Sequence, residues 1–349
     1  MERRNVRKVF WTVWIFVCLS LDAFAQSPYS KTVDGLIREC MDLNFACQFD
    51  SALARARTLE QLLPDESIGY VCRAGVLQSM MIDYATDGWK KEFFQNVNRA
   101  IRIGEKRIRE RKEPAWNWYC LGSVYLYKGL YQGKTGSLVS GFINAHRGIG
   151  YLEKAYKADS TMVDALAGIG SYKYWAGRFY QHLRWLPWIR DERDLGIQML
   201  ETAIHRGTFS NYAGLNSLGW IEYDRNQCEY GLALFERGLE KYADSRLFLW
   251  GKADCLFRLG RMAEAGFAYE RILDSILGDS IPNPINEAEC RMKLALAGEA
   301  QADPDLALEQ CNAILSIKTD SRTSKRIEKQ RQKAIEIKQR ILIQSEVSP

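Results

Sequence analysis

The sequence has little of what catalytic and metal sites usually need. Only three histidines occur in 349 residues, and none belongs to a cluster with cysteines or carboxylates at metal-ligand spacing. HExxH and GxSxG motifs are missing, and the nine cysteines form no CxxC pair. The chain therefore offers no motif for catalysis, for a metal or for a cofactor. We expect a protein that acts by binding and not as an enzyme.

A large excess of one charge is also missing. The 48 lysines and arginines stand against 43 acidic residues, which gives a formal net charge of +5. Without the first 25 residues, which hold four basic and two acidic side chains, the formal charge falls to +3. Such a balance indicates neither a nucleic acid nor an anionic membrane surface as the partner.

Residues 1–25 have the pattern of a secretory signal peptide. Four basic residues among the first eight precede an apolar run over residues 9–21, and Ala23-Phe24-Ala25 supplies a small-x-small cleavage site. The run is shorter than the roughly 20 residues that span a bilayer, and no later segment is apolar enough to do so. We expect cleavage near Ala25 and an exported, periplasmic or envelope-associated protein with at most peripheral membrane contact. An uncleaved membrane anchor is the alternative.

Eight cysteines remain beyond residue 25. An oxidising compartment permits disulfides, but a chain of this length buries a large core without them. Several of these cysteines stand where helix packing favours a small residue. We expect buried free thiols and assign no pairing.

A period of 34 residues organises the C-terminal part of the chain. The repeated pattern is a small residue, a second small residue, an aromatic one, and a small or apolar one. Its two copies stand at Gly219, Gly231, Phe235 and Gly238 and at Ala253, Ala265, Tyr269 and Ile272. Each copy predicts two short amphipathic helices joined by a turn. In these residues and this spacing the sequence resembles the tetratricopeptide repeat (TPR) family.

The resemblance covers nearly the whole chain beyond residue 25 and implies an all-α, right-handed TPR-type solenoid. We predict about seven helical hairpins, which start near residues 33, 67, 115, 163, 212, 246 and 285. Residues 26–320 are assigned to the solenoid, and residues 321–349 to a capping helix and tail. Ile327, Ala334 and Ile341 form the apolar line of that helix, while lysines and arginines keep its remainder in water.

The second, third and fourth hairpins carry inserts between their two helices. The inserts lie near residues 80–92, 130–143 and 178–191. Inserts at equivalent positions of a solenoid project from one edge. They either lengthen the helices by about two turns, roughly 10 Å, or build a binding rim. Gly133, Gly136 and Gly141 disfavour helix in the third insert, and Pro187 does so in the fourth.

Aromatic and basic side chains of the third and fourth inserts would face the partner in such a rim, because interfaces favour aromatics and arginine. The candidates are Tyr131, Lys134, Tyr180, His182, Arg184, Trp185, Trp188 and Arg190. The alternative is that these aromatics fill the inner side of the wall that the inserts form.

The stretch GLYQGKTGS at residues 129–137 is similar to a phosphate-binding loop. The spacing between its first glycine and the Gly-Lys-Thr group is one residue too short for that motif. The motif also needs a preceding strand and a following helix, whereas residues 115–129 are predicted to be the first helix of a hairpin. We therefore expect an ordinary loop.

TPR solenoids usually bind along the concave face, which the first helix of each hairpin lines. The resemblance places an aromatic, mildly acidic set of side chains there: Trp116, Tyr119, Tyr127, Tyr174, Trp175, Asn216, Trp220, Tyr223, Trp250 and Asp254. Relatives that clamp a C-terminal carboxylate use lysine and asparagine where the third hairpin has Tyr119 and Ser123, so that clamp is missing. If the inserts fold back into this trough, the same aromatics form a core instead.

Three functions are open at this point. The first is an exported scaffold that holds a partner protein or an extended peptide in the trough or on the rim. The alternative is a periplasmic protein that binds a small molecule or lipid and works with a transport system, in which case the aromatics enclose a cavity. The third, an enzyme of unknown reaction, has no motif behind it. An open trough favours the first function, and a closed pocket favours the second.

Overall fold

The computed structural model describes residues 28–112, 114–179 and 191–347, and within these ranges it contains 15 helices and no strand. The predicted signal peptide lies outside the described residues. So do six of the predicted rim residues: Tyr180, His182, Arg184, Trp185, Trp188 and Arg190.

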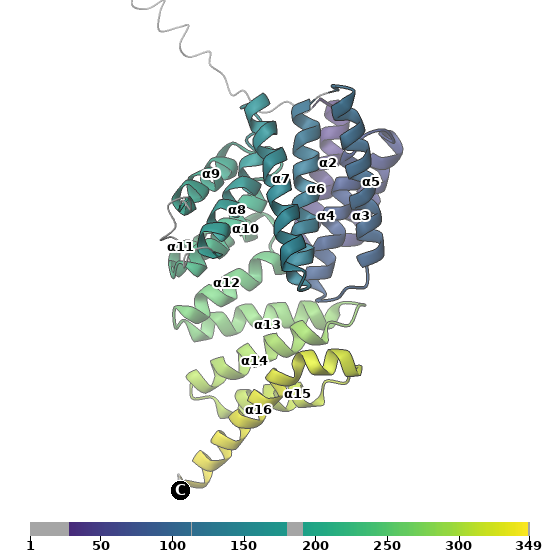
Figure 1. Ribbon diagram of the computed structural model, residues 1–349. Coiled ribbons are helices and arrows are strands. Elements are labelled where there is room, and N and C mark those ends of the chain that lie inside the picture. The colour runs from purple at the N-terminus through teal and green to yellow at the C-terminus, as the bar shows by residue number, and fades with distance from the viewer. Residues whose placement is uncertain (1–27, 113, 180–190, 348–349) are drawn as a thin grey trace, which may run out of the picture.

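Fourteen of these helices form seven consecutive hairpins (Figure 1). The pairs are α2 (Lys31–Phe45) with α3 (Phe49–Leu62), α4 (Ile68–Asp83) with α5 (Lys90–Arg109), α6 (Pro114–Lys134) with α7 (Leu138–Ala158), α8 (Ala165–Phe179) with α9 (Arg193–Arg206), α10 (Asn211–Asp224) with α11 (Cys228–Lys241), α12 (Arg246–Arg258) with α13 (Met262–Gly278), and α14 (Pro284–Ala300) with α15 (Pro304–Ser316). Each predicted hairpin start lies within two residues of the observed one. The prediction of an all-α, TPR-type solenoid of helical hairpins is confirmed.

The fifth and sixth hairpins show the steric origin of the 34-residue pattern. The ring of Phe235 on α11 lies between Gly219 on α10 and Gly251 on α12. A Cβ atom at Gly219 would come within 2.6 Å of this ring, and one at Gly251 within 2.3 Å. Because both distances are far below van der Waals contact, the glycines let three helices close around one buried aromatic side chain.

The third hairpin departs from the expected course. Helices α6 and α7 are 21 residues long each, so the third insert lengthens both of them. The prediction that Gly133 and Gly141 resist helix is wrong. A Cβ atom on Gly141 would lie 2.8 Å from the backbone nitrogen of Gly133, and one on Gly129 would lie 2.8 Å from the carbonyl oxygen of Gly141. Close backbone packing of the two helices at these glycines outweighs their low helix propensity.

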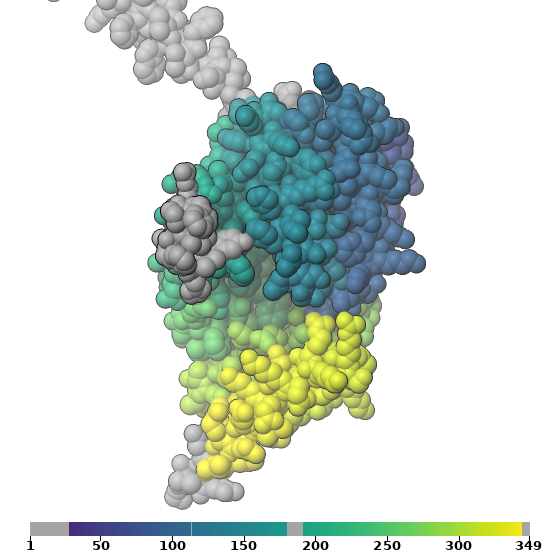
Figure 2. Space-filling view, viewed as in Figure 1, coloured from purple at the N-terminus to yellow at the C-terminus, as the bar shows by residue number. Residues whose placement is uncertain are grey.

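Helix α16 (Ser321–Val347) covers the last hairpin and is the yellow element in Figure 2. The residues of the predicted apolar line are all buried: Ile327, Ala334 and Ile341. The helix also reaches the second hairpin, because Nη1 of Arg326 donates to the carbonyl oxygen of Ala85 at 2.7 Å. It therefore caps the solenoid and ties the C-terminal end of the chain to the loop after α4.

The N-terminal hairpins meet the C-terminal ones along a contact that we call the closure seam. In Figure 1, α2 to α7 stand upright, and α12 and α13 cross beneath them. At the seam, Arg246 at the start of α12 pairs with Asp83 at the end of α4 and, at 2.7 Å, with Asp279. The hydroxyl of Tyr242 donates to Asp42 of α2 at 2.6 Å. The seam closes one side of the solenoid, so part of the concave face becomes an interior.

Apolar and amide groups complete the closure seam. The ring of Phe45 at the end of α2 packs against the rings of Tyr242 and Phe248, with centroids 5.7 and 6.3 Å away. The side-chain amides of Asn283 and Asn286 both donate to the carbonyl oxygen of Asp83 at 2.7 Å. The last backbone carbonyls of a helix have no partner inside that helix, so these amides satisfy one such group of α4.

The described part of the chain bears on two further predictions. Its eight cysteines are all free, and six of them are buried, while Cys47 and Cys72 are half-buried. The expectation of free, mostly buried thiols is therefore confirmed. In the same ranges, no helix combines the length and the apolarity that a membrane crossing demands.

Candidate functional site

An open hollow of about 590 Å³ lies on the concave side of the fourth to sixth hairpins. We call it the C-terminal groove. Its lining comes from three successive first helices: Trp175 and Arg178 on α8, Trp220, Tyr223 and Asp224 on α10, and Arg258 on α12. The structure thus brings together Trp175, Trp220 and Tyr223, which the sequence had placed on the concave face.

The aromatic side chains of the C-terminal groove differ in burial. The side chain of Trp175 is 43% exposed and stands edge-on to the buried Tyr174. Trp220 is half-buried, with its ring edge-on to Phe235 below and to Tyr223 beside it. The groove therefore offers aromatic surface that rests on the core, with Trp175 as its most accessible part.

The charges of the C-terminal groove leave one arginine without a carboxylate. Asp224 accepts from Nε of Arg178 at 3.0 Å and from the hydroxyl of Tyr174 at 2.7 Å, so its charge is neutralised. The guanidinium of Arg258 lies 3.4 Å from the ring centroid of Tyr223, a cation–π contact. Arg258 is exposed and has no ion-pair partner in the described residues. The groove is therefore aromatic with a local positive charge.

Three of the four other concave-face candidates on α8, α10 and α12 serve the packing. Tyr174 is buried, and Trp250 stands edge-on to the buried Tyr269. Asp254 accepts from Nζ of Lys293 at 2.9 Å and from the hydroxyl of Tyr269. Asn216 is half-buried, and its side-chain oxygen has no hydrogen-bond partner. Asp254 in particular does not give the groove a free negative charge.

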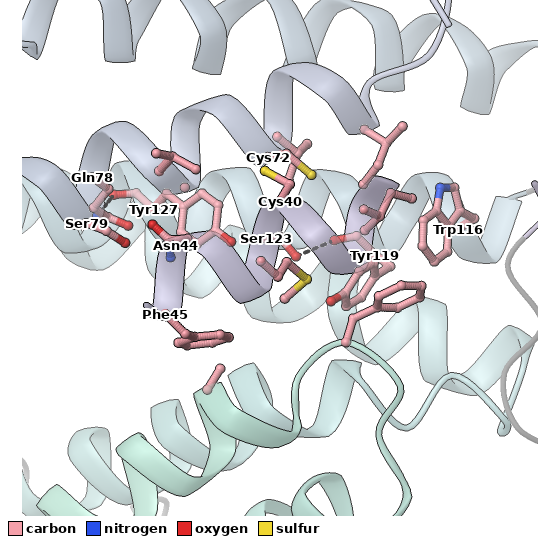
Figure 3. A pocket seen from close by; sticks show the side chains of 18 residues that line it. Cys40, Asn44, Phe45, Cys72, Gln78, Ser79, Trp116, Tyr119, Ser123 and Tyr127 are labelled. Carbon is pink, nitrogen blue, oxygen red and sulfur yellow. Dashed lines mark hydrogen bonds between the residues drawn. The ribbon is translucent and has the colours of Figure 1, made fainter. Parts of the chain in front are cut away.

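The candidates of the third hairpin line a separate cavity of about 220 Å³, which we call the N-terminal cavity. Trp116, Tyr119 and Tyr127 on α6 face it, as Figure 3 shows, and α2 and α4 supply most of its other walls. Phe209 and Ala213, which belong to the fifth hairpin and the loop before it, line the opposite side. At this hairpin the trough is narrowed to a cavity, because residues of a distant hairpin lie across from α6.

Three polar groups of the N-terminal cavity lack a protein partner. The side-chain oxygen of Asn44 is buried and accepts no hydrogen bond. The hydroxyls of Tyr119 and Tyr127 make no hydrogen bond with any described residue, and burial raises the pKa of both well above the ordinary tyrosine value. They therefore stay neutral and able to donate. An apolar cavity with a few unused polar groups is typical of a small-molecule site.

Two predicted rim residues lie within the described part of the chain, and one of them is not at the surface. Tyr131 is only 6% exposed, packs on Phe93 and Phe94, and donates to Asp87 at 3.2 Å. Its assignment to an exposed rim is wrong, because α6 and the second hairpin bury it. Lys134, the last residue of α6, is exposed.

Sequence reasoning missed an apolar line on the first two turns of α7. These side chains are exposed: Leu138, Val139, Phe142 and Ile143. The apolar run LVSGFI in the third insert could have indicated this line, because its apolar residues recur at helical spacing. Gly141 within the run had suggested a non-helical segment instead.

The stretch GLYQGKTGS does not form a phosphate-binding loop. Residues 129–134 belong to α6, so the expectation of an ordinary loop is wrong for them. The backbone amides of residues 135–137 donate to carbonyl oxygens in the last turn of that helix. These amides are the groups that would have to cradle a phosphate. No group of three or more metal-ligating side chains occurs in the described ranges either.

No protein-family model and no curated sequence matches the chain. Among solved structures, the chain is similar to part of a TPR repeat-containing protein from Cytophaga hutchinsonii, with 17% identity over 83% of this chain and 98% of that one, and a TM-score of 0.45. It is also similar to a tetratricopeptide repeat protein from Parabacteroides merdae, with 12% identity over 88% and 100% and a TM-score of 0.38. It is similar to yeast Tom70 as well, with 13% identity over 87% of each chain and a TM-score of 0.31. The fold assignment therefore rests on the hairpins of this chain itself.

Proposed function

We propose that the protein is an exported helical-repeat scaffold that binds an extended segment of a partner protein in the C-terminal groove. The observation that carries this proposal is that one groove holds the exposed Trp175 and Arg258, which has no carboxylate partner in the described residues. Tryptophan, tyrosine and arginine dominate the energetics of protein interfaces. Because the groove spans three first helices, an extended segment fits it better than a compact ligand. The complementary segment carries apolar side chains next to an acidic one.

The partner can be identified by capture with the mature chain, residues 26–349, from the envelope fraction of the source organism. A Trp175→Ala/Arg258→Gln double variant removes the accessible ring and the unpaired charge. A matched control, Phe267→Ala/Arg237→Gln, removes an exposed ring and an exposed charge from the second helices α13 and α11. We expect a synthetic peptide from the captured protein to bind the double variant at least about tenfold more weakly than the control. Equal binding to both variants would refute the groove as the site.

Export rests on the signal pattern of residues 1–25 and has its own test. Expression of the full chain should yield a periplasmic protein whose N-terminus, by Edman degradation or mass spectrometry, is Gln26. A chain of full mass in the cytosolic fraction would contradict export. A chain of full mass in the membrane fraction would support the uncleaved anchor.

A second function is favoured by the N-terminal cavity, with its unpartnered groups on Asn44, Tyr119 and Tyr127. This function is the binding of a small, mostly apolar molecule with one or two polar groups, as in the carriers of transport systems. The cavity, at about 220 Å³, is larger than the cavities of about 150 Å³ that hold a benzene ring in other proteins.

Native mass spectrometry of protein purified from its own envelope separates the two functions. A stoichiometric small mass that is lost in Tyr119→Phe/Tyr127→Phe, but kept in Tyr230→Phe, would support a ligand in the cavity. Tyr230 is exposed on α11, so its variant controls for the loss of a hydroxyl group. A bare chain in all three samples would leave the cavity as a packing feature.

A further inference from the structure

A third pocket, of about 280 Å³, lies where the beginning of α16 meets the second and third hairpins. The loop after α4, the end of α6 and the first turns of α16 line it. In Figure 2 the yellow α16 reaches the lower end of the blue N-terminal hairpins, which is the region of this contact. Gln78 borders both this pocket and the N-terminal cavity, and its side-chain amide donates to the carbonyl oxygen of Tyr127 at 2.9 Å. The two spaces are therefore neighbours that share Gln78 as a wall residue.

Positive charge gathers in this pocket. Lys134, Arg322 and Arg326 line it, and Asp87 is the acidic residue among the lining side chains. The carboxylate of Asp87 is already occupied, since it lies 3.3 Å from Nη2 of Arg322 and accepts from the hydroxyl of Tyr131 at 3.2 Å. Lys134 and Arg326 have no carboxylate partner in the described residues, so the pocket keeps two uncompensated positive charges.

The fold holds these two charges close to one another. Arg326 is fixed by its bond to the carbonyl oxygen of Ala85, at 2.7 Å. Desolvation, and next the charge of Arg326, lower the pKa of Lys134, although Asp87 acts in the opposite direction. Like charges that approach without a counter-ion cost free energy, and a bound anion between Lys134 and Arg326 would remove that cost.

Apolar side chains share the pocket with these charges. Met81 is buried in its wall, whereas Ile82 and Leu130 are 43% and 58% exposed. Leucine and isoleucine side chains left in water next to two unpaired cations form a surface that suits an amphiphilic molecule.

We propose that this pocket binds a small amphiphilic anion. Its carboxylate or phosphate group lies between Lys134 and Arg326, and its apolar part lies against Ile82 and Leu130. The donors are side chains, because the backbone amides of residues 135–137 already bond to carbonyl oxygens of α6. The Gly-Lys-Thr stretch thus contributes a lysine to an anion site of a different construction from a phosphate-binding loop.

Isothermal titration calorimetry at low ionic strength tests the site with hexanoate, hexyl phosphate and inorganic phosphate as probes. The test variant is Lys134→Gln/Arg326→Gln. The control, Lys325→Gln/Lys329→Gln, removes the same charge from exposed positions of α16 that do not line the pocket. We expect one hexanoate or hexyl phosphate per chain, and a loss of affinity of at least about tenfold in the test variant but not in the control.

Two further measurements keep the proposal open to refutation. The single variant Lys134→Gln removes no hydrogen bond or ion pair with a described residue. It should unfold at the same temperature as the wild type, and a thermal melt then separates weak binding from unfolding. Ile82→Ser should weaken hexyl phosphate and leave inorganic phosphate unchanged. The proposal is overturned if no probe binds the wild type at millimolar concentration, or if the test variant and the control bind equally. Equal affinity for inorganic and hexyl phosphate would overturn its apolar half.

Discussion

The two halves of the solenoid use the same kind of hairpin but differ on their concave side. In the N-terminal half, Trp116 of α6 is 4% exposed and its ring stands edge-on to that of Phe209, with centroids 5.9 Å apart. In the C-terminal half, Trp175 of α8 is 43% exposed in an open groove. The closure seam makes this difference, because it returns the fifth and sixth hairpins onto the first two. An aromatic residue on a first helix is therefore core or binding surface according to which distant hairpin covers it.

The largest effect should come from breaking the closure seam. Arg246 is 4% exposed and faces two carboxylates, those of Asp83 and Asp279. Arg246→Met leaves both without their cation, and we expect the free energy of unfolding to fall by about 3–5 kcal/mol. Urea unfolding followed by circular dichroism measures the loss.

An exposed ion pair supplies the control for this variant. Arg271 pairs with Asp244, which is 90% exposed, and Arg271→Met should cost less than about 1 kcal/mol. If the two variants are equally stable, the seam does not hold the two halves together.

The second prediction compares one residue type in the two halves. Trp116 donates through Nε1 to the hydroxyl of Tyr29 at 3.0 Å and packs on Phe209. Trp116→Ala should therefore cost about 3–5 kcal/mol, as expected for a buried aromatic. Trp175→Ala should cost less than about 1 kcal/mol, because nearly half of that side chain is already in water. A similar cost for both, in thermal or urea unfolding, would mean that the halves do not differ in this way.

The third prediction concerns the long helices of the N-terminal half. A Cβ atom on Gly141 would meet backbone atoms of Gly129 and Gly133 at 2.9 and 2.8 Å, and we expect Gly141→Ala to cost about 1–3 kcal/mol. A Cβ atom on Gly133 would meet nothing within 4 Å. Gly133→Ala should accordingly be neutral or stabilise the helix by up to about 1 kcal/mol. A shift of the melting temperature in the same direction for both would refute the backbone contact between α6 and α7.

The last prediction is a pH dependence that both halves share. Burial raises the pKa of the Cys120 thiol and that of Cys255 from 9.0 to about 12. Between pH 9 and 12 the unfolded chain loses these protons while the folded chain keeps them, so the free energy of unfolding falls as the pH rises. The decrease of the free energy of unfolding per pH unit should be smaller by about 1 kcal/mol in Cys120→Ala, and by the same amount in Cys255→Ala. Unchanged slopes in urea titrations above pH 9 would contradict buried thiols in both halves.

The hairpins could be predicted because their signals are local. The ring of Phe235 fits between two first helices. Tyr269, 34 residues later, is also buried and stands edge-on to Trp250 and Phe257 of the first helix α12. The same frame put Trp175, Trp220 and Tyr223 on the concave side of their first helices, and the structure brings them together in one groove.

The burial of individual candidates could not be predicted because distant elements decide it. Tyr131 and Trp175 are both aromatic residues that the sequence suggested for a binding surface. The second hairpin covers Tyr131, however, and leaves Trp175 exposed. Asp83 and Arg246 are 163 residues apart, and nothing in either neighbourhood marks them as a pair. The low helix propensity of glycine predicted a break at Gly141. The close approach of α6 instead requires a residue without a side chain at that position of α7.

The closure seam also bears on how the chain folds and how its length can change. In an open array each repeat contacts only its neighbours, so folding can begin anywhere and spread, and repeats can be gained or lost at the ends. Here the bonds from Tyr242 to Asp42 and from Arg326 to Ala85 join residues 200 and 241 positions apart. Contacts of such long range raise the contact order and slow folding. The number of hairpins is also fixed, because removing one would bring a different hairpin to the seam.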